Sequence, residues 1–89
     1  MDEKTSEIFK ALAHPVRIKI IKQLYDGPIC VCHINRNIDY SQANISKHLK
    51  ILKNAKIVKS TKEGMYQYYK LTDDNIKKII TLAEEIILK

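Results

Sequence analysis

The 89-residue sequence is poor in residues that interrupt or cross-link a chain, with no tryptophan, two glycines, two prolines and two cysteines. It contains no internal repeat, Gly/Ser linker or low-complexity tract, and 45% of its residues are apolar. The longest apolar run, residues 29–32, is far shorter than the roughly 18 residues that cross a bilayer. These absences exclude a membrane-spanning helix and wholesale disorder, and they predict a single domain over residues 1–89.

Basic residues outnumber acidic ones: the chain has 16 Lys and Arg and 10 Asp and Glu, which gives a formal net charge of +6 and a pI near 9.4. Clustered cations release counterions when they meet phosphates, so nucleic acid is the first candidate partner and an anionic membrane surface the second. A Lys-rich surface without a specific partner is the alternative. Charge alone does not decide between them.

The beginning of the chain is acidic at Asp2 and Glu3 and has no apolar segment before a small-residue cleavage site. It does not resemble a secretory signal, so we expect a cytoplasmic protein with no membrane partner. That compartment keeps thiols reduced, and the two cysteines therefore indicate metal binding, redox chemistry or simple burial rather than a disulfide framework. No Ser/His/Asp or Cys/His set, paired carboxylate or phosphate-binding glycine loop is present, so we expect no enzyme and no required cofactor.

Apolar residues recur at helical spacing in five segments. They predict helices over residues 5–13, 15–25, 29–38, 42–54 and 73–89. His14 precedes or caps the second helix, Ser41 follows a turn over residues 39–41 and caps the fourth, and Thr72 or Asp73 caps the last. In the last helix, the apolar residues recur at intervals of three, four and seven; they are Ile76, Ile79, Ile80, Ala83, Ile86 and Ile87.

Two β-rich runs, residues 57–61 and 65–71, flank the turn residue Gly64 and predict a hairpin. The order is four helices, a hairpin and one more helix. This mainly α arrangement with a β-hairpin (α-α-α-α-β-β-α) is what a winged helix-turn-helix requires. We therefore expect residues 42–54 to be a recognition helix and the hairpin to be a wing.

The predicted recognition helix is small, hydroxylic and cationic on the side opposite its apolar stripe. Gln42 can pair with a base edge, Ser46 with a base or phosphate, and the lysines with phosphates or guanine. A merely solvated face is the alternative, and lysines on the following ribbon argue against it. The predicted DNA-contacting residues are Gln42, Ala43, Ser46, Lys47, Lys50, Lys59 and Lys62.

Three segments carry a family resemblance: residues 9–17 (FKALAHPVR), 41–49 (SQANISKHL) and 62–71 (KEGMYQYYKL). Together they resemble the ArsR/SmtB family of small winged-helix metalloregulatory repressors. The resemblance implies a homodimer that binds an imperfect inverted repeat in an operator on double-stranded DNA and leaves it when an effector binds. It also implies that Gln42, Ala43, Ser46 and Lys47 face the major groove.

The Cys30-Val31-Cys32 motif lies where arsenic-, lead- and cadmium-sensing members of that family carry a Cys-x-Cys pair. On a regular helix these two side chains point about 200° apart, so they share one ion only if the first turn is unwound or distorted. Thiolates favour soft ions, which makes As(III) the first candidate and Sb(III), Cd(II), Pb(II), Hg(II) or Zn(II) the others. Asn35 stands where some arsenic sensors have a third cysteine, so His33, a partner-chain group or a solvent thiol has to supply any third donor.

Other interpretations of the cysteines remain open. They can be core residues, or a thiol redox sensor that needs no third ligand. The chain can also be an effector-independent nucleic-acid-binding or architectural protein. We expect a homodimer because the first and last helices carry more apolar surface than so short a chain buries internally.

Overall fold

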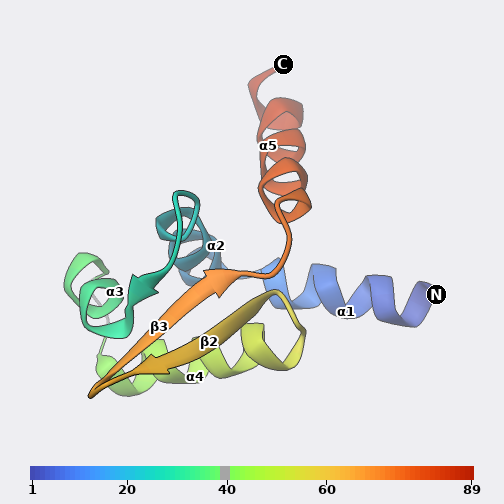
Figure 1. Cartoon of the computed structure of the whole chain (residues 1–89). Coiled ribbons are helices and arrows are strands. Elements are labelled where there is room, and N and C mark those ends of the chain that lie inside the picture. Colours follow the sequence, from blue (N-terminus) through green and yellow to red (C-terminus); the bar gives the residue numbers. More distant parts are fainter. Residues whose placement is uncertain (39–40) are drawn as a thin grey trace.

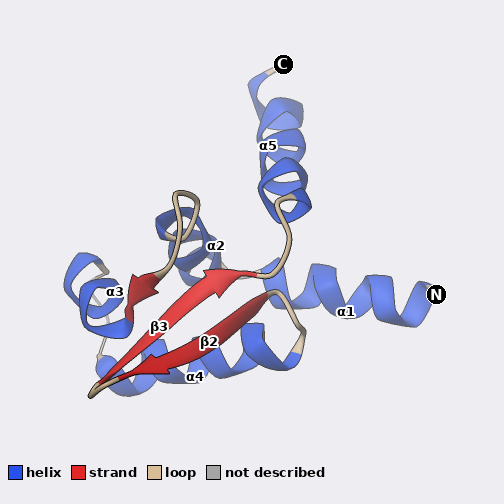
Figure 2. Cartoon of the chain, in the orientation of Figure 1, coloured by secondary structure: helices blue, strands red, loops and turns tan. Residues whose placement is uncertain are grey.

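The computed structural model describes residues 1–38 and 41–89 (Figure 1). The elements are α1 (Asp2–Leu12), α2 (Pro15–Gln23), β1 (Ile29–Cys30), α3 (Val31–Asn37), α4 (Gln42–Asn54), β2 (Val58–Glu63), β3 (Tyr66–Leu71) and α5 (Asn75–Leu88). Figure 2 shows the sheet between the helices, with α4 along one side of the hairpin. The predicted order of helices and hairpin is confirmed, and one short strand is added to it. Positions 39 and 40 of the predicted turn lie outside the described residues.

The added strand, β1, is a correction to the predicted helix over residues 29–38. Ile29 pairs with Tyr69 and Cys30 with Tyr68, so β1 joins β3 in a three-stranded antiparallel sheet of order β1-β3-β2. A short apolar run fits a strand as well as a helix, and the free edge of β3 decides in favour of the strand. Helix α3 therefore begins only at Val31.

Helix α4 has the predicted bounds. The Oγ atom of Ser41 accepts a hydrogen bond from the Asn44 backbone N–H at 3.2 Å and so caps the helix. Ile45, Leu49 and Leu52 are buried on its inner side, as their spacing predicts. They join the core, whose buried residues are Ala11, Leu12, Val16, Ile20, Ile21, Leu24, Ile34, Ile38, Ile45, Leu49, Leu52, Ile57, Val58, Ile76 and Ile80.

The start of α5 differs from the prediction that Thr72 or Asp73 caps it. The Oγ1 hydroxyl of Thr72 donates to the carbonyls of Lys56 at 2.7 Å and Ile57 at 3.1 Å, and so ties the end of β3 to the loop after α4. Asp73 does act at the helix start, because its Oδ1 accepts from the Asn75 N–H at 2.8 Å. The N-cap residue of α5 is Asp74, whose side chain makes no cap hydrogen bond, so the acceptor at this helix start comes from Asp73 one residue earlier.

Helices α1 and α5 leave much of their apolar surface uncovered. Within α5 only Ile76 and Ile80 are buried, while Ile86 and Ile87 are 72% and 79% exposed, as expected of a helix with more apolar surface than the chain buries internally. Figure 1 shows why, because α5 projects away from the sheet. A salt bridge of 2.7 Å between Lys22 and Glu84 holds α5 to α2. None of the described helices is long and apolar enough to span a membrane.

The cap of α4 gives a stability prediction. We expect Ser41→Ala to lower the free energy of unfolding by about 1 kcal/mol, because the Asn44 N–H loses its acceptor. Ser46→Ala is the matched control, since Ser46 is an exposed residue inside the same helix and alanine is a better helix former there. Urea unfolding measures both variants, and an equal loss in both would contradict the cap.

Candidate nucleic-acid interface and cysteine pair

The outward side of α4 is exposed and cationic. All five predicted contact residues of this helix are exposed, namely Gln42, Ala43, Ser46, Lys47 and Lys50. The helix has no Asp or Glu along its length. No carboxylate of its own therefore neutralises the lysines, and the face suits an approaching phosphate backbone.

The hairpin brings its two predicted lysines to opposite faces. The Nζ atom of Lys53 on α4 donates to Ser60 Oγ on β2 at 2.8 Å, which shows that Ser60 faces α4. Side chains alternate along a strand, so Lys62 shares this face and Lys59 lies on the other. The structure thus places Lys62 on the side of the recognition helix and Lys59 away from it.

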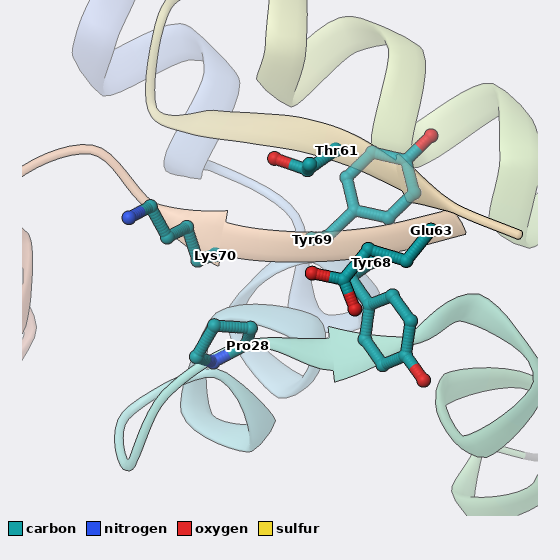
Figure 3. A pocket seen from close by; sticks show the side chains of 6 residues that line it. All are labelled: Pro28, Thr61, Glu63, Tyr68, Tyr69 and Lys70. Atoms are coloured by element: carbon teal, nitrogen blue, oxygen red, sulfur yellow. The ribbon is translucent and has the colours of Figure 1, made fainter. Parts of the chain in front are cut away.

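A cavity of about 440 Å³ lies beside the sheet and is lined by Pro28, Thr61, Glu63, Tyr68, Tyr69 and Lys70. Figure 3 shows Tyr68 and Tyr69 projecting to opposite sides of β3. Tyr69 packs against the core and so has a structural role. The lining has one carboxylate and one ammonium, so its charge does not indicate an anionic ligand.

Cys30 and Cys32 lie at the junction between β1 and α3. Cys30 has extended backbone angles (φ −63°, ψ 140°) and is the N-cap of α3, where its sulfur accepts from the Cys32 N–H at 3.3 Å. The two sulfur atoms are paired as a disulfide, and the Cα atoms are 5.3 Å apart. Residues 29 and 30 are extended and not the first turn of a helix, so the two side chains meet in the way the expected loss of regular helix at this point allows.

The two cysteines differ in solvent exposure, and the described residues group no third metal-ligating side chain with them. Cys30 is buried and Cys32 is exposed. Across residues 1–38 and 41–89, no three His, Cys, Asp or Glu side chains are grouped to hold a metal ion. His33, the donor suggested by the sequence, is an exposed residue. The described residues thus offer two soft donors and leave any third to another source.

A polar cluster that no sequence pattern predicts links α4 to the α1–α2 junction. The Nε atom of Arg17 donates to His48 Nδ1 at 3.1 Å. The ring of His14 lies 4.5 Å from that of His48, and its Nδ1 caps α2 by accepting from Val16 N–H. Burial lowers the pKa of His48 below its ordinary value of 6.5, and His14, Arg17 and Lys47 lower it further by repulsion.

The helices, the hairpin and the exposed cationic helix define a winged helix-turn-helix, a class of DNA-binding domain. A family model described as bacterial regulatory protein, arsR family, matches residues 14–60. The chain belongs to this family of transcriptional regulators. That membership confirms the resemblance to the ArsR/SmtB family, and it agrees with the expectation that the protein is not an enzyme.

Relatives and solved structures resemble the chain over most of its length. An uncharacterised helix-turn-helix regulator of Methanocaldococcus jannaschii is 47% identical, over 94% of this chain and 96% of that protein. The arsenical resistance operon repressor of Bacillus subtilis is 35% identical, over 97% of this chain and 88% of its own. A homodimeric winged helix-turn-helix domain of Mycobacterium bovis, solved by NMR, has a TM-score of 0.85 and 25% identity, over 96% and 79% of the two chains.

Proposed function

We propose that the protein is a dimeric repressor that binds an operator through α4 and leaves it when a soft metal or metalloid ion binds Cys30 and Cys32. The observation that carries the DNA-binding half is the exposed, acid-free outer face of α4. Gln42 near the start of the helix pairs with a base edge, while Lys47 and Lys50 meet phosphates or guanine. Lys62 extends this surface from the wing.

The dimer forms through α1 and α5. These helices border an apolar groove of about 460 Å³, lined by Phe9, Leu12, Ala13, Ile18, Ile79, Ile80, Ala83, Glu84 and Ile87. A second copy covers the exposed apolar surface and places two α4 helices about 34 Å apart, one helical turn of DNA. The homodimeric state of the Mycobacterium bovis domain supports this assembly.

The effector is a thiophilic ion held by the two sulfurs, with As(III) as the first candidate and Sb(III), Cd(II), Pb(II) or Zn(II) as the others. Once the Cys30–Cys32 disulfide is reduced, its two thiolates are donors that favour a soft ion, and the similarity to an arsenical resistance repressor supports arsenic. Cys30 belongs to β1, which pairs with the wing strand β3, and its sulfur caps α3. An ion that moves Cys30 therefore acts on the wing and on the helix-turn-helix together.

Thiol oxidation is the second candidate signal, and the paired sulfurs favour it directly. Two thiols and one peroxide molecule give a disulfide and two water molecules, so this switch needs no third ligand. A third possibility is an architectural protein without an effector. Competition with unrelated duplex separates it from a repressor, because a specific regulator prefers its own promoter by about 10³-fold or more.

Removing single DNA-facing side chains tests operator binding. We expect Lys47→Ala and Lys62→Ala each to weaken operator binding and to reduce the slope of log affinity against log salt concentration by about one, since each variant loses about one phosphate contact. We expect Gln42→Ala to weaken binding and also to relax the sequence preference. Lys59→Ala should lose less operator affinity than Lys62→Ala, because Lys59 lies on the opposite face of β2 from Lys62. Fluorescence anisotropy at several salt concentrations measures these effects. Unchanged affinity in the first three variants would refute the assignment.

The oligomeric state tests the α1–α5 interface. We expect light scattering to show a dimer at micromolar concentration, and Ile87→Glu to give a monomer with weaker operator binding, since a carboxylate in an apolar interface loses its hydration. Thr81→Glu is the control, because it adds the same charge to an exposed position of α5 outside the groove lining. A monomeric wild-type protein would contradict the dimer.

The cysteine pair is tested with reduced protein bound to its operator. We expect arsenite to lower operator affinity by about 5- to 150-fold, an ordinary allosteric coupling, and the Cys30→Ser/Cys32→Ser double variant not to respond. Release by peroxide without any ion would favour the redox signal instead. A double variant that still releases DNA on adding arsenite would place the sensor elsewhere.

A further inference from the structure

One side chain, Arg17, connects three helices near the recognition helix. From α2, its Nη1 donates to the carbonyls of Lys10 and Ala11, each at 3.3 Å, at the end of α1. Carbonyls at a helix end lack the regular partner of the helix interior. The Lys10 carbonyl also accepts from the Ala13 N–H at 3.3 Å, so Arg17 adds a second donor there. Its Nε donates to His48 Nδ1 on α4 at 3.1 Å. The guanidinium group thus fixes α4 to the α1–α2 junction through a single imidazole nitrogen.

This contact depends on the charge state of His48. Because Nδ1 accepts the Arg17 proton, a neutral His48 carries its own proton on Nε2. Protonation of Nδ1 turns this acceptor into a donor and places a cation beside a guanidinium group. The hydrogen bond with Arg17 therefore exists only while His48 is neutral.

We propose that Arg17 and His48 form a pH-sensitive clasp that holds α4 in position for its operator, and that acidification opens the clasp and weakens operator binding. The regulatory half of this inference rests on operator binding by α4, as proposed above. His48 stands between Lys47, which faces outward, and Leu49, which faces the core. A change in how α4 is held at this point moves its DNA-facing residues, so Arg17 and His48 are positioning residues rather than DNA contacts.

The groups around His48 set the direction of the pH effect. His14 faces it from the α1–α2 junction, Arg17 from α2 and Lys47 from α4 itself. Glu7 and Lys10 of α1 line the adjoining groove together with Arg17. Burial first, and then repulsion from His14, Arg17 and Lys47, lower the pKa of His48 below 6.5. The folded state therefore binds fewer protons than the unfolded state below about pH 6.5, so the clasp is intact above that pH and is lost as the pH falls through the lower folded value.

Acidification also adds positive charge to the protein, which by itself raises its affinity for DNA. Asparagine variants separate the loss of the Arg17–His48 hydrogen bond from this general gain. An Asn side chain at position 48 keeps an acceptor near the place of Nδ1 but does not titrate. His33→Asn is the matched control, because His33 is an exposed histidine on α3. His14→Asn tests the other ring of the cluster, since Asn preserves the cap of α2.

The readout is the ratio of operator affinities at about pH 7.5 and at a pH below the titration midpoint of His48 measured by NMR, at constant ionic strength. We expect wild type and His33→Asn to lose roughly three- to tenfold on acidification, the size of one lost hydrogen bond, and His48→Asn to lose no affinity. The proposal is overturned if His48→Asn falls as much as wild type, or if His14→Asn alone removes the fall.

Nitrogen-15 NMR of the free protein tests the clasp without DNA. We expect His48 to carry its proton on Nε2 at neutral pH, to titrate below its ordinary pKa of 6.5, and to lose the Nδ1 hydrogen-bond shift in Arg17→Lys. A proton on Nδ1 would refute the clasp. A protein that binds no operator at any pH would refute the proposed function and the regulatory half of this inference, while the NMR result still decides the clasp.

Discussion

Burial of one side of α4 is the constraint on which the rest of the structure depends. Ile45, Leu49 and Leu52 are within 1% of complete burial, and a helix turns 100° per residue. Fixing this stripe against the core therefore fixes the direction of every other side chain on α4, including Lys47 and Lys50. The exposure of the cationic side of α4 follows directly from the burial of its apolar side. A mutation that loosens the core in this region disturbs the outer face as well.

A core of this size has a second consequence at the other helices. Small chains bury a smaller fraction of their surface than large ones, and here the core ends at Ile76 and Ile80 on α5 and at Ala11 and Leu12 on α1. The remaining apolar residues of both helices stay in contact with solvent in one copy of the chain. The limit on burial in one copy thus accounts for the apolar surface on which the proposed dimer rests.

The sequence predicted those parts of the fold that depend on local spacing. The bounds of α4 follow from its apolar stripe and from Ser41, which are neighbours in the chain. Strand β1 could not be predicted, because two residues form a strand only through their partner β3. For the same reason, the opposite faces of Lys59 and Lys62 required the register of the hairpin. The contact between Arg17 and His48 joins residues 31 positions apart, and no pattern within the sequence indicates it.

The cysteine pair shows why a short strand suits a switch. β1 has only two residues, so few hydrogen bonds hold it to β3, and each contributes about 0.5 to 1.5 kcal/mol. A coupling of 1 to 3 kcal/mol between an effector and DNA is of the same size. A ligand or oxidant at Cys30 therefore does not have to disturb the core, because loss of one or two bonds at the β1–α3 junction is sufficient. Cys30 lies at the β1–α3 junction and His48 on α4 itself, so the two proposed signals act on different elements, and their effects on operator binding should add to one another.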